Sequence, residues 1–349
     1  MPPIDIVSDV RRITQKQILT NVPKRWAEQF SFGLKAYSLK PFQSANGNGR
    51  SVVANPSTAA TKTDRLLANL KLADHLGLVF DGLNLIKSSS FVNIDHSDMN
   101  RLTVLVGALQ TRKGRAVPCL VEALHSDRLP GEGSAKSTPR TNMLRRARAK
   151  ARLWQSFTGH VIDSLQNFHD RLGFWPKLVF DRGFGNESLV THLQAEGAIF
   201  YIRLKGGRFV EFDGQMTEVK QLKEKDAVIS LFGLKLRIIR SPKSRRAKEP
   251  WYILTNDFSS SRGKIVTIYY HRFEIEETFK DVKHIWELKR TRLNKPNSLK
   301  VILWFICFGI ALIYLVTKPV KQNPKKQSSW IRQGFEQLSR AYSQLLWTG

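Results

Sequence analysis

The chain of 349 residues is poor in acidic residues, with 29 Asp and Glu against 56 Lys and Arg. The resulting net charge of +27 repels other cations and attracts polyanions, nucleic acid first and an anionic membrane second. A protein that is merely basic is the weaker interpretation of so large an excess. Because hydrophobic residues reach 42%, a large core is possible, and one large domain or two to three smaller ones are expected.

Cysteine is scarce: Cys119 and Cys307 both lie in apolar runs, and neither has a CxxC partner. This pattern argues against a disulfide framework and favours buried thiols in a reducing compartment. The eight histidines show no pairing with cysteines of the kind that binds structural zinc. The N-terminus has no basic start followed by an apolar core, so no signal peptide is expected.

Long hydrophobic runs are limited to residues 301–317, a stretch of 17 residues without a charge and with lysines on both sides. This lies at the lower edge of the length needed to span a membrane, about 17–25 residues. The alternative is a helix that is apolar all round because it is buried inside a large α/β domain. We expect the buried helix and no membrane partner, since a single short span would be unusual in a chain of this charge.

The first 80 residues indicate helices, with helical spacing over 9–22 and over 63–80. Thr63 or Asp64 is the expected cap of the second helix. Three runs rich in β-branched residues follow, at 89–98, 102–110 and 115–124, and these are typical of an antiparallel meander. A long basic helix is then expected over about 143–171.

The remaining order of elements completes the prediction of the fold. A strand ends at Asp181, a helix ends at Gly197, another strand follows, and 206–256 is rich in β-strand patterns before two final helices. This order predicts an α/β fold, a ribonuclease H-like core with a β-rich insertion before the last catalytic helix, plus an N-terminal helical region. The N-terminal region is expected over 1–80. The core is expected in two parts, 81–205 and 257–318, with the insertion between them over 206–256. A helical tail is expected over 319–349.

The stretch YYHRFEIEETFKDVK, residues 269–283, is predicted to be one amphipathic helix. An ordinary surface helix with charges of both signs is the plainer explanation. A helix turn of about 100° per residue, however, gathers an unusual set on one stripe. The stripe contains Tyr269, Arg272, Glu276, Phe279, Lys280 and Lys283. One acid among groups that can bind phosphate indicates a site.

Three carboxylates stand where such a fold could bring them together. Asp95 interrupts an apolar strand, Asp181 ends another strand, and Glu276 lies on the stripe described above. Each has an alternative role, since the aspartates could cap turns and Glu276 could pair with Arg272. Asp81, before a glycine, is the less favoured alternative to Asp95. Converging carboxylates are the ligands that two divalent ions need for phosphoryl transfer on DNA.

These residues resemble the DDE transposases of bacterial insertion sequences, in the group with the Y-R-E-K signature (the insertion-sequence-four group). The signature Y-x2-R-x3-E-x6-K is met by Tyr269, Arg272, Glu276 and Lys283. The segment NIDHSDM is similar to the family's first-aspartate strand, and VFDRGFGNESLVTHL to its second-aspartate turn. The resemblance extends over roughly residues 70–318.

The resemblance implies a transposase that cleaves DNA at terminal inverted repeats and transfers the 3′ ends into target DNA. Asp95, Asp181 and Glu276 would be both catalytic residues and the ligands of two Mg²⁺ or Mn²⁺ ions. Tyr269, Arg272 and Lys283 would bind DNA at the cleavage point. The basic helix, with Arg145, Arg146 and Arg148, is a candidate for backbone contacts, although a solvated cationic face explains it equally well.

The resemblance further implies a cytoplasmic, nucleoid-associated bacterial protein, a homodimer in the synaptic complex, and a DNA-end-binding role for residues 1–80. The alternatives are a ribonuclease H-like DNA nuclease that does not join ends, an inactive DNA-binding copy, and a membrane-attached protein anchored by 301–317.

Overall fold

The computed structural model describes residues 6–38, 48–49, 52–53, 55–99, 102–125, 141–242, 249–288, 293–316 and 329–346. The chain divides into two compact units. The first unit consists of Met1–Leu85, His96–Asp127 and Glu274–Gly349, and the second of Ile86–Asp95 and Arg128–Phe273. Each unit is described by itself.

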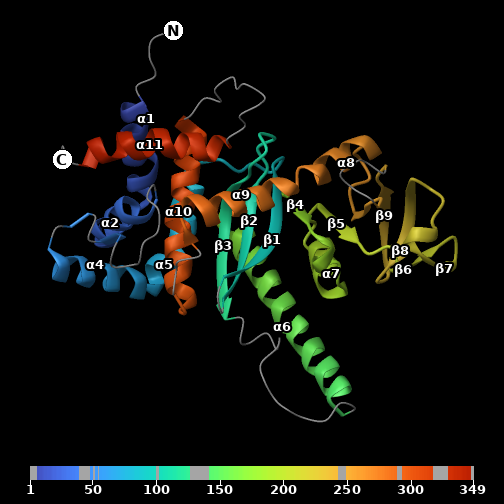
Figure 1. The fold of residues 1–349 in the computed structure, drawn as a ribbon. Helices are drawn as coiled ribbons and strands as arrows, with labels where there is room; N and C mark the ends of the chain where they lie inside the picture. The colour runs from blue at the N-terminus through green and yellow to red at the C-terminus, as the bar shows by residue number, and fades with distance from the viewer. Residues whose placement is uncertain are drawn as a thin grey trace, which may run out of the picture. The chain divides into compact units, whose positions relative to one another are not determined.

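The first unit is built around the apolar helix α10 (Pro296–Val316), which Figure 1 shows amid the N-terminal helices and α11. Its neighbours are α1 (Ile6–Ile13), α2 (Ala27–Tyr37), α4 (Pro56–Ala68), α5 (Leu70–Asp81) and α11 (Trp330–Leu346). The helix is long and apolar enough to cross a membrane, but 83% of its most apolar window is buried inside the protein. The burial agrees with the predicted core helix, and the N-terminal helices pack against it within the first unit.

The contact between α10 and α2 depends on the absence of a side chain at Gly309. A Cβ atom at this position would lie 2.0 Å from the backbone carbonyl oxygen of Ser38. That distance is far below any van der Waals contact, so only glycine allows the two backbones to approach this closely. On another side of α10, Lys300 forms ion pairs with Asp74 of α5 at 3.1 Å and with Glu122 at 3.0 Å.

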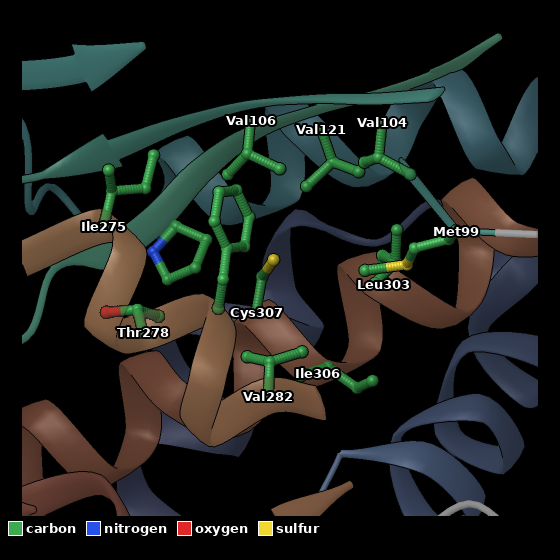
Figure 2. A pocket seen from close by; sticks show the side chains of 12 residues that line it. Met99, Val104, Val106, Val121, Ile275, Thr278, Val282, Leu303, Ile306 and Cys307 are labelled. Carbon is green, nitrogen blue, oxygen red and sulfur yellow. The ribbon is translucent and has the colours of Figure 1, made fainter. Parts of the chain in front are cut away.

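The first unit also contains the antiparallel pair β2 (Leu102–Leu109) and β3 (Val117–His125). Helix α9 (Phe273–Ile285), whose first residue belongs to the second unit, packs on this pair through an apolar face. Figure 2 shows Ile275, Thr278 and Val282 of α9 lining one pocket together with Val106 and Val121 of the strands and Cys307 of α10. The packing leaves an apolar cavity of only about 20 Å³. Phe279 lines this cavity, so its place in the sequence pattern reflects packing.

The second unit contains most of the sheet. The strand order in the second unit is β1-β4-β5-β10-β9-β8-β6-β7, and in the first unit it is β3-β2-β1. Strand β1 (Phe91–Met99) takes part in both, because the boundary between the units falls after Asp95. The other strands are β4 (Lys177–Phe180), β5 (Phe200–Leu204), β6 (Phe209–Phe212), β7 (Gln215–Glu218), β8 (Asp226–Leu231), β9 (Leu234–Arg240) and β10 (Tyr252–Thr255). Strands β1, β4 and β5 are parallel, and β10 is antiparallel to both β5 and β9. The mixed sheet agrees with the predicted α/β fold.

Three helices complete the second unit: α6 (Thr141–Leu172), α7 (Glu187–Ala195) and α8 (Arg262–Tyr270). Helix α8 packs through Ile265, Ile268 and Tyr269 on one face of the sheet, in a cluster that includes Val179 of β4. On the other face, the ring of Phe180 contacts Phe184, which in turn contacts Phe157 of α6. Side chains along a strand alternate between the two faces of the sheet. Residue 181, two positions after Val179, therefore lies on the face covered by α8.

Two predicted helices are each divided in the structure. The helix expected over 63–80 is α4 followed by α5, because the Asn69 side chain accepts a hydrogen bond from Leu72 N (3.0 Å) and starts a new helix there. The helix α4 begins after Asn55, so the predicted caps Thr63 and Asp64 were wrong. The single helix expected over 269–283 was also wrong: α8 ends at Tyr270 and α9 begins at Phe273.

Candidate active site

Asp95 and Asp181 stand at the same level on two adjacent parallel strands. The last registered pair of β1 and β4 is Ile94 with Phe180, and each aspartate is the next residue. In a parallel pair, side chains at matching positions point to the same face of the sheet. Both aspartates therefore lie on the face covered by α8. Asp181 directly follows the carboxyl end of β4, where sites in α/β sheets commonly form, and Asp95 lies beside it in the middle of β1.

The guanidinium of Arg272 lies between the two carboxylates. Its Nη1 atom is 3.5 Å from Asp95 Oδ2, and its Nη2 atom is 4.0 Å from Asp181 Oδ1. Arg272 is 3% exposed, whereas the side chains of Asp95 and Asp181 are 16% and 34% exposed. The rings of Phe273 and Tyr269 lie 4.8 and 5.8 Å from the guanidinium carbon. The arginine therefore neutralises the pair from the protein side and leaves the carboxylates partly open to solvent.

The turn between α8 and α9 explains how Arg272 reaches this position. Asn93, two residues before Asp95 on β1, donates a hydrogen bond to the carbonyl oxygen of His271 (3.1 Å). The N–H of Arg272 donates to Tyr269 O (3.0 Å). These bonds replace the continued helix and turn Arg272 toward Asp95 and Asp181. The buried ion pairs therefore prevail over helical periodicity at this point, since a buried charge without partners is strongly destabilising.

Tyr269 is a core residue in this structure, with 0% exposure. Its ring contacts Trp251 at 5.4 Å between centroids, and Trp251 is itself buried in the same cluster. Burial raises the pKa of the Tyr269 hydroxyl, and the positive charge of Arg272 opposes this shift. The predicted contact between this hydroxyl and a DNA phosphate stays a prediction, and it requires the hydroxyl to become accessible.

Glu276 and Lys283 lie on α9 in the first unit. Lys283 donates a hydrogen bond to Ser97 Oγ (2.8 Å), on β1 two residues after Asp95. Glu276 is half-buried on the first turn of the helix. The structure thus brings Asp95, Asp181 and Arg272 together in the second unit. The meeting of Glu276 with the two aspartates stays a prediction.

The other acids of α9 have structural roles. Glu274 is 4% exposed and accepts hydrogen bonds from the backbone N–H groups of Thr111 (2.9 Å), Arg112 (3.3 Å) and Gly114 (3.3 Å). Glu277 pairs with Arg115 at 3.4 Å and also with Lys280. These hydrogen bonds and ion pairs hold the turn between β2 and β3 against α9. Among the neighbouring acids of this helix, Glu276 is the one that the signature spacing selects.

The chemistry of the two aspartates fits a divalent metal. Carboxylate oxygens are the ligands that Mg²⁺ prefers, and both side chains retain some solvent exposure. Within the described part of the chain, no group of three His, Cys, Asp or Glu side chains is arranged to hold a metal ion. The structure therefore presents two oxygen-donor residues facing an arginine, and a third ligand would have to join them.

The other predicted DNA contacts lie on the long basic helix. Arg145, Arg146 and Arg148 lie on α6, in a part of the helix where side chains are outside the described residues.

Comparison with known proteins bears directly on this arrangement. Residues 158–312 match the family model of the transposase DDE domain. No curated protein matches the chain. The matched segment includes Asp181, Arg272, Glu276 and Lys283, and it supports a transposase function in general, with a ribonuclease H-like fold and DNA as partner. Asp95 precedes the match, and what links it to the transposase DDE domain is its position beside Asp181.

Arg203 is a site residue that sequence reasoning missed. The last registered pair of β4 and β5 is Phe180 with Ile202, so Arg203 follows at the same level as Asp181. Burial raises the pKa of the Tyr269 hydroxyl, and the positive charge of Arg203, like that of Arg272, opposes this shift. The sequence offered no signal for it, because a lone arginine at the end of an apolar run carries no signature and its level follows only from the strand register in the structure.

Asp257 is a second missed residue, and it positions α8. It is 3% exposed and accepts hydrogen bonds from Tyr201 Oη (2.7 Å), Ser259 N (2.9 Å) and Ser260 N (3.0 Å). Burial alone would raise the pKa of this carboxyl, but the hydrogen bonds from Ser260, Tyr201 and Ser259 outweigh it and hold the pKa well below its usual range. The carboxylate thus shapes the turn that leads into α8, whose N-terminus is capped by Ser261.

Replacing Asp257 by Asn is expected to lower the free energy of unfolding by about 2–3 kcal/mol at pH 7, because hydrogen bonds to a buried charge are lost. A depressed folded-state pKa contributes stability above the unfolded value of 3.8, and this contribution is lost as the pH falls through the folded value. The difference between D257N and wild type should therefore shrink below about pH 4. Urea unfolding at several pH values measures this. The exposed Asp163→Asn is the control, and a deficit independent of pH would contradict the assignment.

Proposed function

We propose that this protein is a cut-and-paste transposase of the insertion-sequence-four group, which carries the Y-R-E-K signature. It cleaves DNA at terminal inverted repeats and transfers the 3′ ends into target DNA. The observation that carries the proposal is the pair Asp95 and Asp181, level with each other on adjacent parallel strands, with Asp181 inside a transposase DDE domain.

The proposed chemistry assigns a role to each site residue. Asp95, Asp181 and Glu276 would hold two Mg²⁺ or Mn²⁺ ions, which when bound activate the attacking oxygen and stabilise the leaving oxygen. Arg272 holds the two aspartates in a fixed geometry through its planar fork. Lys283, and Tyr269 once accessible, would bind the phosphates next to the cleaved bond. Placing the reacting groups in this way lowers the barrier by positioning as well as by charge.

The finer features of the proposal concern partners and location. The N-terminal helices would bind the terminal repeats, Arg145, Arg146 and Arg148 would follow the DNA backbone, and two copies would hold two ends in a synaptic complex. The net charge of +27 supports association with a polyanion. It is therefore consistent with the proposed bacterial protein that works on the DNA of the nucleoid. These features rest on charge and on the family, without a described contact.

The test uses the full chain, Mg²⁺ or Mn²⁺, and a labelled duplex that contains the inverted repeats flanking its own gene. We expect cleavage at the repeat border and joined products when target DNA is added. Cleavage without joining would indicate a nuclease of the same fold. Binding without cleavage, with either ion, would indicate an inactive DNA-binding copy. In both of these cases the proposal would be wrong.

A further inference from the structure

A basic cleft lies beside the strand end that carries Asp181, wholly within the second unit. Its volume is about 250 Å³. The lining comes from the segment between β4 and α7, which includes Arg182 and Asn186, and from the segment after β5, which includes Lys205 and Arg208. We call these residues, with Gly183, Gly185 and Leu204, the basic cleft. Arg182 directly follows Asp181 in the chain, so the cleft begins where the carboxylate pair ends.

The charge of the basic cleft is of one sign. Arg182, Lys205 and Arg208 contribute three cations, and none of its lining residues is acidic. In the described part of the chain, no carboxylate forms an ion pair with any of the three. Arg182 and Lys205 are exposed, while Arg208 is held over the ring of Phe232 at 5.0 Å. Three cations gathered in a concave surface without counter-charges repel one another, so an anion that neutralises them is favoured.

The backbone of the cleft also suits an extended anion. Gly183 has open space around the position of a Cβ atom, and Arg182–Phe184 form a single 3-10 turn after β4. The Asn186 side chain already caps α7 by accepting from Leu189 N (3.0 Å), and its Nδ2 donates to Phe184 O (3.5 Å), so the cationic side chains are the groups left to bind an anion. Cations spaced along two loops fit successive phosphates of a strand better than one small anion, since each can meet a separate charge.

We propose that the basic cleft binds the phosphodiester backbone of DNA next to the carboxylate pair. This inference rests on the proposed function and deepens it, because it names the surface that carries the strand adjoining the cleaved bond. Two DNA segments have this chemistry: the flank beyond the repeat border before cleavage, and the target DNA during joining. The sequence read there is arbitrary in both, which agrees with a cleft that offers charges and few groups for reading bases.

The experiment compares wild type with the double variant Arg182→Ala/Lys205→Ala, which changes only exposed side chains. The matched control is Lys223→Ala/Lys235→Ala, which removes the same charge from exposed positions of the second unit outside the cleft. Fluorescence anisotropy at several salt concentrations measures the affinity for three ligands. The first is a repeat duplex that extends past the border, and the second is a repeat duplex that ends at the border. The third is a target duplex of random sequence, added to protein that has already bound the border-ended repeat duplex. Thermal unfolding checks that each variant is folded.

We expect the cleft variant to lose about tenfold or more in affinity and about two units of salt slope for one of the longer ligands, since each phosphate contact contributes about 0.9 to that slope. A loss of affinity for the extended repeat duplex would show that the cleft binds the flank. A loss of affinity for the target duplex would show that it binds target DNA. The variant Arg182→Lys/Lys205→Arg should bind as wild type does. Equal affinity in the cleft variant, or an equal loss in the control, overturns the inference. If wild type binds all three ligands but neither cleaves the extended repeat duplex nor joins ends to the target, the proposed function fails while the cleft is still tested.

Discussion

Replacing Asp181 by Asn is expected to reduce DNA cleavage and joining by about 10³-fold while the protein stays folded. The amide keeps the shape of the side chain and its place after Phe180, but it removes one of the two charges that face Arg272. The loss of charge stabilisation of the transition state amounts to several kcal/mol, and each 1.4 kcal/mol is about tenfold in rate. Asp95→Asn and Glu276→Gln should behave alike, because the three acids act as one unit in the proposal.

Matched acids outside the site provide the controls for this prediction. Asp98 is exposed on β1 and accepts a hydrogen bond from Thr103 (2.8 Å), and Glu277 is one residue from Glu276 on α9. Asp98→Asn and Glu277→Gln should retain cleavage within a few-fold of wild type. Titration calorimetry with Mn²⁺ adds a second measurement, in which D181N should bind less metal. Full cleavage by D181N would remove Asp181 from the catalytic set, and normal metal binding would remove it from the ligands.

The parallel strands were the part of the site that the sequence predicted best. Asp95 interrupts one short apolar run and Asp181 ends another, and runs of this kind predict buried strands. The structure confirms both strands and places the two residues at equivalent positions. The register that also brings Arg203 to this level was not predictable, because strand pairing depends on contacts between residues far apart in sequence.

The segment 269–283 shows why the rest could not be predicted. Its spacing fits a continuous helix, and local propensity gives no reason for a break after Tyr270. The break arises from tertiary contacts: the bond from Asn93 to His271 and the ion pairs of Arg272 with Asp95 and Asp181. The stripe of six residues then separates into core, ion pair and exposed positions, with Tyr269 buried and Lys280 exposed. Residues of a functional signature need not share one helical face.

Replacing Arg272 by Met is expected to lower the free energy of unfolding by about 3–5 kcal/mol in the presence of a chelator, because it leaves two neighbouring carboxylates without their buried partner. Met keeps most of the side-chain volume against Phe273 and Tyr269, so the lost charge accounts for most of the effect. DNA cleavage should fall as well, since the aspartates are no longer held in place. Urea unfolding followed by circular dichroism measures the loss.

The response of this variant to metal separates two roles of Arg272. If the aspartates bind divalent ions, Mn²⁺ supplies the missing positive charge, and it should stabilise R272M more than it stabilises wild type. Arg237→Met is the matched control, because Arg237 also forms a partly buried ion pair in the second unit, with Asp226, away from the carboxylate pair. That variant should lose stability without gaining any extra response to metal. If Mn²⁺ stabilises R272M and wild type equally, Arg272 and the ion do not share the two aspartates, and the arginine is then a structural partner of carboxylates that bind no metal.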